Sequence, residues 1–138
     1  MKILLDTNVI SELVKPNCNQ NVKSLLDNFN WNDTYLSAFT FGELCYGLEK
    51  MPEGKRKHEL SIWIYMKLPV SFKNRILFHD TDVFIEWGKL RARSKRTLPY
   101  DDSLLAAVAL CHNMILVTRN TSDFEGIEGI KLINPWDE

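Results

Sequence analysis

The chain begins MKILLDTNVI (residues 1–10), and this stretch decides how the rest is interpreted. The apolar run Ile3-Leu4-Leu5 is too short for a helix and is typical of a buried strand in a parallel sheet. Asp6 then stands at the carboxyl end of that strand, the edge at which open α/β sheets bind ligands. We therefore expect a functional site at this edge, with Asp6 as a member.

Length and composition indicate one ordinary globular domain. The 138 residues are enough to bury most of a core, so we expect a single domain over residues 1–138. No window approaches the roughly 18 consecutive apolar residues of a membrane span, and Asp6 interrupts any signal peptide at once. We expect a cytoplasmic protein with no membrane association. The net charge of −1 means that any nucleic-acid binding has to depend on local basic patches.

Short apolar runs alternate with segments of helical periodicity along the chain. Besides 3–5, strands are predicted at 35–36, 76–78, 115–118 and 131–133. Helices are predicted at 8–14, 22–29, 38–50, 60–66 (closed by Pro69), 83–95 and 102–111, with a loop at 51–57. Asn113 is the expected residue just beyond the last helix. This alternation predicts an α/β fold with a parallel sheet and right-handed crossovers.

Four acidic residues stand at the ends of these elements: Asp6, Glu43, Asp102 and Asp123. Each has a purely structural alternative. Asp6 could cap the following helix, and Thr40-x-x-Glu43 fits a capping box. Asp102, like Asp101 beside it, suits a helix start, and Asp123 suits a turn.

Taken together, the four carboxylates predict a metal site. Carboxylates that meet at one sheet edge repel one another, and their pKa values rise unless a cation joins them. Oxygen ligands select hard cations, so we expect Mg²⁺ or Mn²⁺. A pair of such ions roughly 4 Å apart would suit phosphodiester hydrolysis.

Five segments, in order along nearly the whole chain, carry a family resemblance. They are LLDTNVIS (4–11), YLSAFTFGEL (35–44), LPYDDSLLAA (98–107), LVTRNTSDF (116–124) and INPW (133–136). Through them the sequence resembles the PIN-domain ribonucleases, specifically the VapC-type toxins of bacterial toxin–antitoxin pairs, including the similar FitB group.

The resemblance implies a PIN-like three-layer sandwich whose central parallel sheet of about five strands has the order 3-2-1-4-5. It also implies an Mg²⁺- or Mn²⁺-dependent endoribonuclease that cleaves RNA, often tRNA, and is inhibited by a cognate antitoxin. Homodimers are common among such proteins, so a homodimer is expected.

Matching the motifs residue by residue gives roles to individual side chains. The acidic ligands are Asp6, Glu43, Asp102 (which the register aligns in preference to Asp101) and Asp123. Asn120 is the alternative for the fourth position, as a weaker ligand. Thr7, Asn8 and Thr118 match small polar residues that support the acidic cluster.

Basic and aromatic residues suggest surfaces for partners. Arg119 is the preferred candidate for an RNA phosphate contact, whereas basic residues within 50–58 and 89–96 suit solvated helix ends equally well. The segments 22–29 and 58–66 are candidates for an antitoxin groove. Cys45 and Cys111 are expected in the core, and so are most of five aromatic residues: Phe29, Trp31, Trp63, Tyr65 and Phe72.

Two other functions compete with the nuclease. A phosphohydrolase with Asp6 as nucleophile would need a second Asp two positions later, where Asn8 stands. A non-catalytic RNA- or partner-binding PIN-like module would not need the acidic set. The presence of all four acids favours the enzyme.

Overall fold

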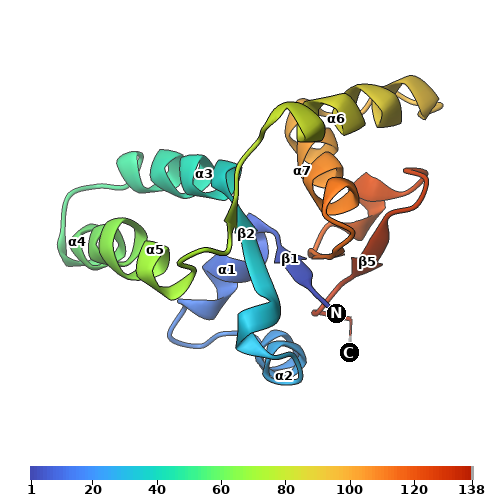
Figure 1. The fold of residues 1–138 in the computed structure, drawn as a ribbon. Coiled ribbons are helices and arrows are strands. Elements are labelled where there is room, and N and C mark those ends of the chain that lie inside the picture. The colour runs from blue at the N-terminus through green and yellow to red at the C-terminus, as the bar shows by residue number, and fades with distance from the viewer. Residues whose placement is uncertain (138) are drawn as a thin grey trace.

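The structure is a computed structural model that describes residues 1–137. Its five strands are β1 (Ile3–Leu5), β2 (Thr34–Ser37), β3 (Ile76–Leu77), β4 (Ile115–Val117) and β5 (Lys131–Ile133). They form one parallel sheet in the order β3-β2-β1-β4-β5, with β1 in the centre (Figure 1). The predicted α/β class and the 3-2-1-4-5 order are confirmed.

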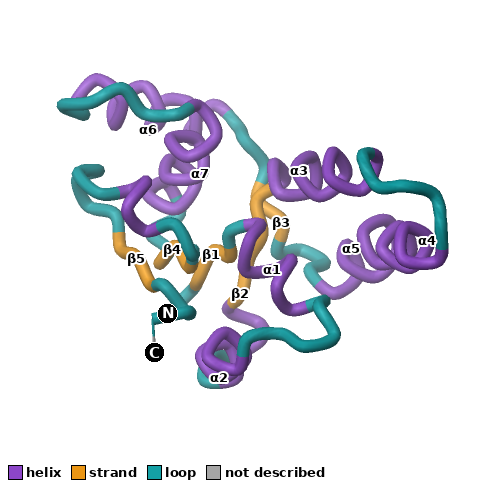
Figure 2. Tube along the Cα trace, turned by 180° about the vertical axis from the view of Figure 1, so that it is seen from behind, coloured by secondary structure: helices purple, strands orange, loops and turns teal. Residues whose placement is uncertain are grey.

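Helices cover both faces of this sheet. They are α1 (Thr7–Leu13), α2 (Gln20–Asp27), α3 (Ala38–Glu49), α4 (Lys55–Ile62), α5 (Leu68–Ser71), α6 (Thr81–Arg93) and α7 (Tyr100–Cys111), with short 3₁₀ turns η1 (Trp31–Asp33) and η3 (Thr121–Phe124) and a π turn η2 (Trp63–Lys67). Figure 2 shows α6 and α7 on one side of the sheet and α1 to α5 on the other. No helix in residues 1–137 is both long and apolar enough to cross a membrane.

The alternation of side chains along β1 explains the three layers. Ile3 and Leu5 pack into one apolar cluster with residues of α1, α2 and α5, whereas Leu4 packs into a second cluster with α6 and α7. All three side chains are fully buried, as a central strand covered on both faces requires. The ladder continues beyond the strand, because the Asp6 N–H donates to the Val117 carbonyl. Asp6 is thereby fixed at the carboxyl edge, beside the end of β4.

The helical region before β3 differs from its prediction. The helix begins at Lys55 and runs to Ser71, so the loop is shorter than 51–57, and the prediction that Pro69 closes the helix is wrong. The π turn immediately before Pro69 is the physical reason. There the Leu68 N–H donates to the Trp63 carbonyl, five residues back, and this wider turn accommodates a proline ring that would clash in a regular α-helix.

Several residues expected in the core lie nearer the surface. Trp31 and Tyr65 are about half exposed, and Phe78 falls just outside β3 and is exposed. Cys45 and Cys111 are half-buried free thiols, and the Cys45 Sγ lies 3.0 Å from the Tyr65 hydroxyl. The helices that carry Cys45 and Cys111, α3 and α7, are apolar over most of their circumference. Periodicity alone therefore does not show which of their apolar side chains face outward.

Candidate active site

Asp6 combines the two roles that the sequence left open. One carboxylate oxygen accepts from the Thr7 N–H at 2.7 Å and so caps α1. The other accepts from the Thr118 hydroxyl at 2.7 Å and from the Asn8 amide at 3.4 Å. The cap therefore orients the side chain and leaves its second oxygen on the side of the other predicted site residues.

Glu43 reaches the same place from α3. The Thr7 hydroxyl donates to its carboxylate at 2.6 Å, and the Thr7 and Thr40 hydroxyls lie 3.1 Å apart. The helix is capped by Ser37, whose hydroxyl accepts from the Phe39 N–H, so Thr40 is not an N-cap. The capping-box alternative for Glu43 is therefore wrong. The Glu43 carboxylate is instead hydrogen-bonded to Thr7, the residue that follows Asp6.

The turn after β4 completes this hydrogen-bond network. Thr118 is fully buried, and its hydroxyl oxygen also accepts from the backbone N–H of Asn120 at 3.1 Å. The Arg119 N–H donates to the Asn8 side chain at 3.3 Å. The predicted supporting residues Thr7, Asn8 and Thr118 thus contact a site carboxylate directly, whereas Asn120 joins through its main chain.

Asp102 approaches from α7, on the opposite face of the sheet. Burial raises its pKa to about 6, and the negative charges of Asp101, Asp123, Asp6 and Glu43 contribute to the rise. Asp102 is therefore close enough to the other three predicted carboxylates to be affected by their charges, although the four come from separate segments.

Asp101 is a fifth acidic member that sequence reasoning set aside. Its carboxylate accepts from the Asp102 N–H at 2.9 Å, and its charge also raises the pKa values of Asp6 and Glu43. The only feature of the sequence that could have indicated this role of Asp101 is its position beside Asp102 at the start of a helix. The motif register selected one of them and gave no reason to include the other.

Burial is the largest cause of the raised pKa values of Asp6 and Glu43. Hydrogen bonds from Thr118 and from the Thr7 N–H lower the pKa of Asp6, and the hydrogen bond from the Thr7 hydroxyl lowers that of Glu43. The charges that act most strongly on both groups are negative. The site therefore favours a cation.

The donor chemistry suits a hard divalent ion, because every candidate ligand is a carboxylate or amide oxygen. The arrangement is open, however. No three His, Cys, Asp or Glu side chains within residues 1–137 are placed so that they would hold a metal ion as they stand. Carboxylate rotation toward a common centre is thus a requirement of any metal-dependent reaction here.

Arg119 lies at the rim of this site with its guanidinium turned to Trp136. Its Cζ atom is 4.9 Å from the centroid of that ring, and its main-chain carbonyl accepts from the Asn134 amide at 3.0 Å. Its predicted phosphate contact stays a prediction.

Comparisons with known proteins agree with this fold. Residues 3–129 match the PIN domain, and the chain belongs to the PIN-domain family. It is 36% identical to VapC ribonuclease Y4jK of Sinorhizobium fredii over 98% of both chains, and 34% identical to Toxin FitB of Neisseria gonorrhoeae over 99% of both. It is 31% identical to the tRNA(fMet)-specific endonuclease VapC of Salmonella typhimurium, over 99% of this chain and 98% of that one.

A solved structure gives the same result in three dimensions. The chain superposes on one from the crystal structure of FitAcB from Neisseria gonorrhoeae with a TM-score of 0.91, at 34% identity and over 99% of both chains.

Proposed function

We propose that this protein is a metal-dependent endoribonuclease of the VapC/FitB toxin type, which cleaves RNA and is neutralised by a cognate antitoxin. One observation carries the proposal. Carboxylates from both faces of the sheet lie at its carboxyl edge, where burial and, after it, the charges of the neighbouring carboxylates raise the pKa of Asp102 to about 6. The stability of the fold does not require such a cluster. Phosphodiester hydrolysis with divalent ions does require one, because the carboxylates hold the ions.

Asp6, Glu43, Asp102 and Asp123 are the residues proposed to hold Mg²⁺ or Mn²⁺, with Asn120 as a weaker alternative at the fourth position. The bound ion would lower the pKa of a water molecule and offset the negative charge that develops on the phosphate. The protein's own contribution is orientation. Thr118 and Thr7 donate hydrogen bonds of 2.7 and 2.6 Å to the carboxylates of Asp6 and Glu43, which restricts the orientations of both side chains before an ion binds.

The proposed partners follow from the same assignment. RNA, with tRNA as a candidate, is the substrate, and Arg119 at the rim is the proposed phosphate contact. The antitoxin is the proposed inhibitor, since a relative over almost the entire chain is named Toxin FitB. Homodimerisation and a cytoplasmic location belong to the same proposal.

RNA cleavage by wild type and Asp6→Asn tests the function. Mixed tRNA is incubated with Mg²⁺, Mn²⁺ or EDTA, and its fragments are resolved by electrophoresis. Wild type should cut only with a divalent ion, and Asp6→Asn should lose at least about a hundredfold in rate. Asp33→Asn, which changes a carboxylate in η1 before β2, is the matched control and should cut normally.

The open arrangement of the carboxylates keeps a non-catalytic RNA-binding module as the second candidate. The same assay separates the two functions. Equal cutting by wild type and Asp6→Asn would refute the proposed site, and RNA binding without any cutting by wild type would favour the second candidate.

A further inference from the structure

A partly exposed aromatic cluster lies beside the acidic site, between α6 and α7. Its members are Phe84, Trp87 and Tyr100. The Trp87 ring is in edge contact with both others, at centroid distances of 5.9 Å to Phe84 and 5.6 Å to Tyr100. Tyr100 directly precedes Asp101 and Asp102 and is 58% exposed. Its ring is thus available to a ligand at the site.

The cluster is held in place by the same helix turn that carries Asp102. The Trp87 indole N–H donates to the Ser103 hydroxyl at 3.0 Å, and this hydroxyl donates to the Tyr100 carbonyl at 3.0 Å. Ser103 is fully buried. These hydrogen bonds fix the Trp87 ring, and the Tyr100 ring packs against it, so the Tyr100 ring loses less conformational freedom when a flat ligand packs on it.

Positive charge adjoins the cluster. The Arg91 guanidinium lies over the Trp87 ring, with Cζ 4.3 Å from the centroid. Arg91, Lys95 and Arg96 line a hollow of about 480 Å³ that has no acidic residue in its lining. Arg96 also donates to the main-chain carbonyl of Asp123 at 2.7 Å, so this hollow is linked to the turn that carries the fourth carboxylate.

We propose that Tyr100 stacks on an unpaired base of the RNA next to the cleaved phosphodiester, and that Arg91 binds a phosphate of the same strand. Aromatic rings beside cations are the usual means of binding single-stranded nucleic acid, because every base offers a flat face and every nucleotide a charge. The inference rests on the proposed ribonuclease function and adds to it the surface that selects unpaired RNA.

A second copy of this chain is the competing occupant, since Phe84 and Ile85 are also exposed on α6. The adjoining cations and the position of Tyr100 beside Asp102 favour RNA, because a dimer interface requires neither. The molecular mass of each variant in solution therefore forms part of the test.

Binding is measured by fluorescence anisotropy in EDTA, with a short labelled single-stranded RNA and with the same strand in a duplex. Tyr100→Ala should raise the Kd for the single strand about tenfold and leave the Kd for the duplex unchanged. Tyr100→Phe keeps the ring and should bind like wild type. Trp31→Ala is the matched control. It removes another exposed ring with an arginine over it (Arg75 at 5.3 Å) from η1, before β2 begins, and should bind normally.

Arg91→Ala tests the phosphate contact. It should weaken binding to any RNA sequence and lower the slope of log Kd against log salt by about one. In cleavage assays, Tyr100→Ala should raise KM and leave kcat largely unchanged.

The two proposals fail in different ways. If wild type cuts RNA while Tyr100→Ala keeps its Kd and KM, this inference is wrong and the proposed function stands. A change of Tyr100→Ala from dimer to monomer with unchanged RNA affinity would assign the cluster to self-association. If wild type neither binds nor cuts RNA, the proposed function fails, and the inference fails with it.

Discussion

Single hydroxyl groups decide how the site carboxylates are held, and Thr118 shows this most clearly. Its hydrogen bond lowers the pKa of Asp6, which burial otherwise raises. Thr118→Val keeps the shape of this buried residue and removes the hydrogen bond. We expect kcat/KM for RNA to fall about tenfold, with the acidic limb of the pH–rate profile moving to higher pH. A profile unchanged in shape and position would contradict this assignment.

Asp102 has a pKa of about 6 in the folded protein, above its ordinary value of 3.8. The folded state therefore binds this proton more tightly than the unfolded state, and stability is lost as the pH rises through this range. Without divalent ions, Asp102→Asn should be more stable than wild type at pH 8, by on the order of 1 kcal/mol after solvent screening. The two proteins should converge below about pH 4 in thermal melts. A variant less stable than wild type at pH 8 would refute the raised pKa of Asp102.

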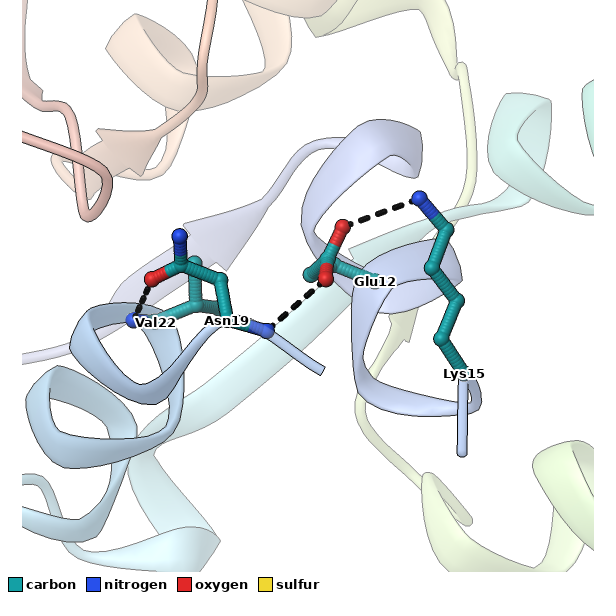
Figure 3. A network of polar contacts seen from close by, with 4 residues as sticks. All are labelled: Glu12, Lys15, Asn19 and Val22. Atoms are coloured by element: carbon teal, nitrogen blue, oxygen red, sulfur yellow. Dashed lines mark hydrogen bonds and ion pairs between the residues drawn. The ribbon is translucent and has the colours of Figure 1, made fainter. Parts of the chain in front are cut away.

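At the scale of elements, the junction between α1 and α2 depends on Glu12 (Figure 3). This residue is 7% exposed, and its carboxylate accepts from the Asn19 N–H at 2.8 Å and from Lys15 at 3.1 Å. Asn19 in turn caps α2 by accepting from the N–H groups of Asn21 and Val22. One carboxylate thus fixes the residue that begins the next helix.

Glu12→Gln tests this junction. The hydrogen bond from Asn19, followed by that from Lys15, lowers the pKa of Glu12 below its ordinary 4.5. The stabilisation is therefore present above pH 4.5 and lost as the pH falls through the lower folded value. We expect a lower Tm for Glu12→Gln at pH 7 and a smaller difference at pH 3. Lys15→Met should change the Tm less, because the Lys15 side chain is 57% exposed.

Elements whose signal is local were predictable. β1 and β4 are short apolar runs ended by polar residues, and Asn113 has the left-handed φ of 53° expected just beyond α7. The passage of a helix through Pro69 was not predictable, because it depends on a wide turn that shifts the hydrogen-bond partners. Glu12 was missed for a related reason, since a charged residue in a helix gives no sequence signal of burial.

Most of the site could be predicted from the direction in which the chain runs through the sheet. Asp6 follows a strand directly, and parallel strands bring their carboxyl ends to one edge. The four acidic residues at the ends of these elements were therefore expected together: Asp6, Glu43, Asp102 and Asp123. The choice between capping and site membership required three dimensions, because Ser37 rather than Thr40 caps α3. The charge contributed by Asp101 and the direction of the Arg119 side chain depend on rotamers, which sequence periodicity does not specify.

At the scale of the whole molecule, the acidic site joins two halves that are packed separately. The apolar clusters on the two faces of the sheet are distinct, and β1 contributes side chains to both. Asp6 follows this shared strand, Glu43 lies on α3, and Asp102 lies on α7 on the other face. An ion held by all three would cross-link both layers, which no single apolar cluster does.

Thermal melts with and without divalent ions test this cross-link. An ion that binds only the folded state stabilises it by about 2.7 kcal/mol at a hundred times its Kd, so Mn²⁺ or Mg²⁺ should raise the Tm at pH 8 by several degrees over NaCl of equal ionic strength. At pH 5 the rise should shrink, because Asp102, with its pKa of about 6, is largely protonated. Asp6→Asn should lose the effect, whereas Asp33→Asn, changed in η1, should retain it. An equal rise in wild type and Asp6→Asn would place the ion elsewhere, and the carboxylates would then have to be explained without it.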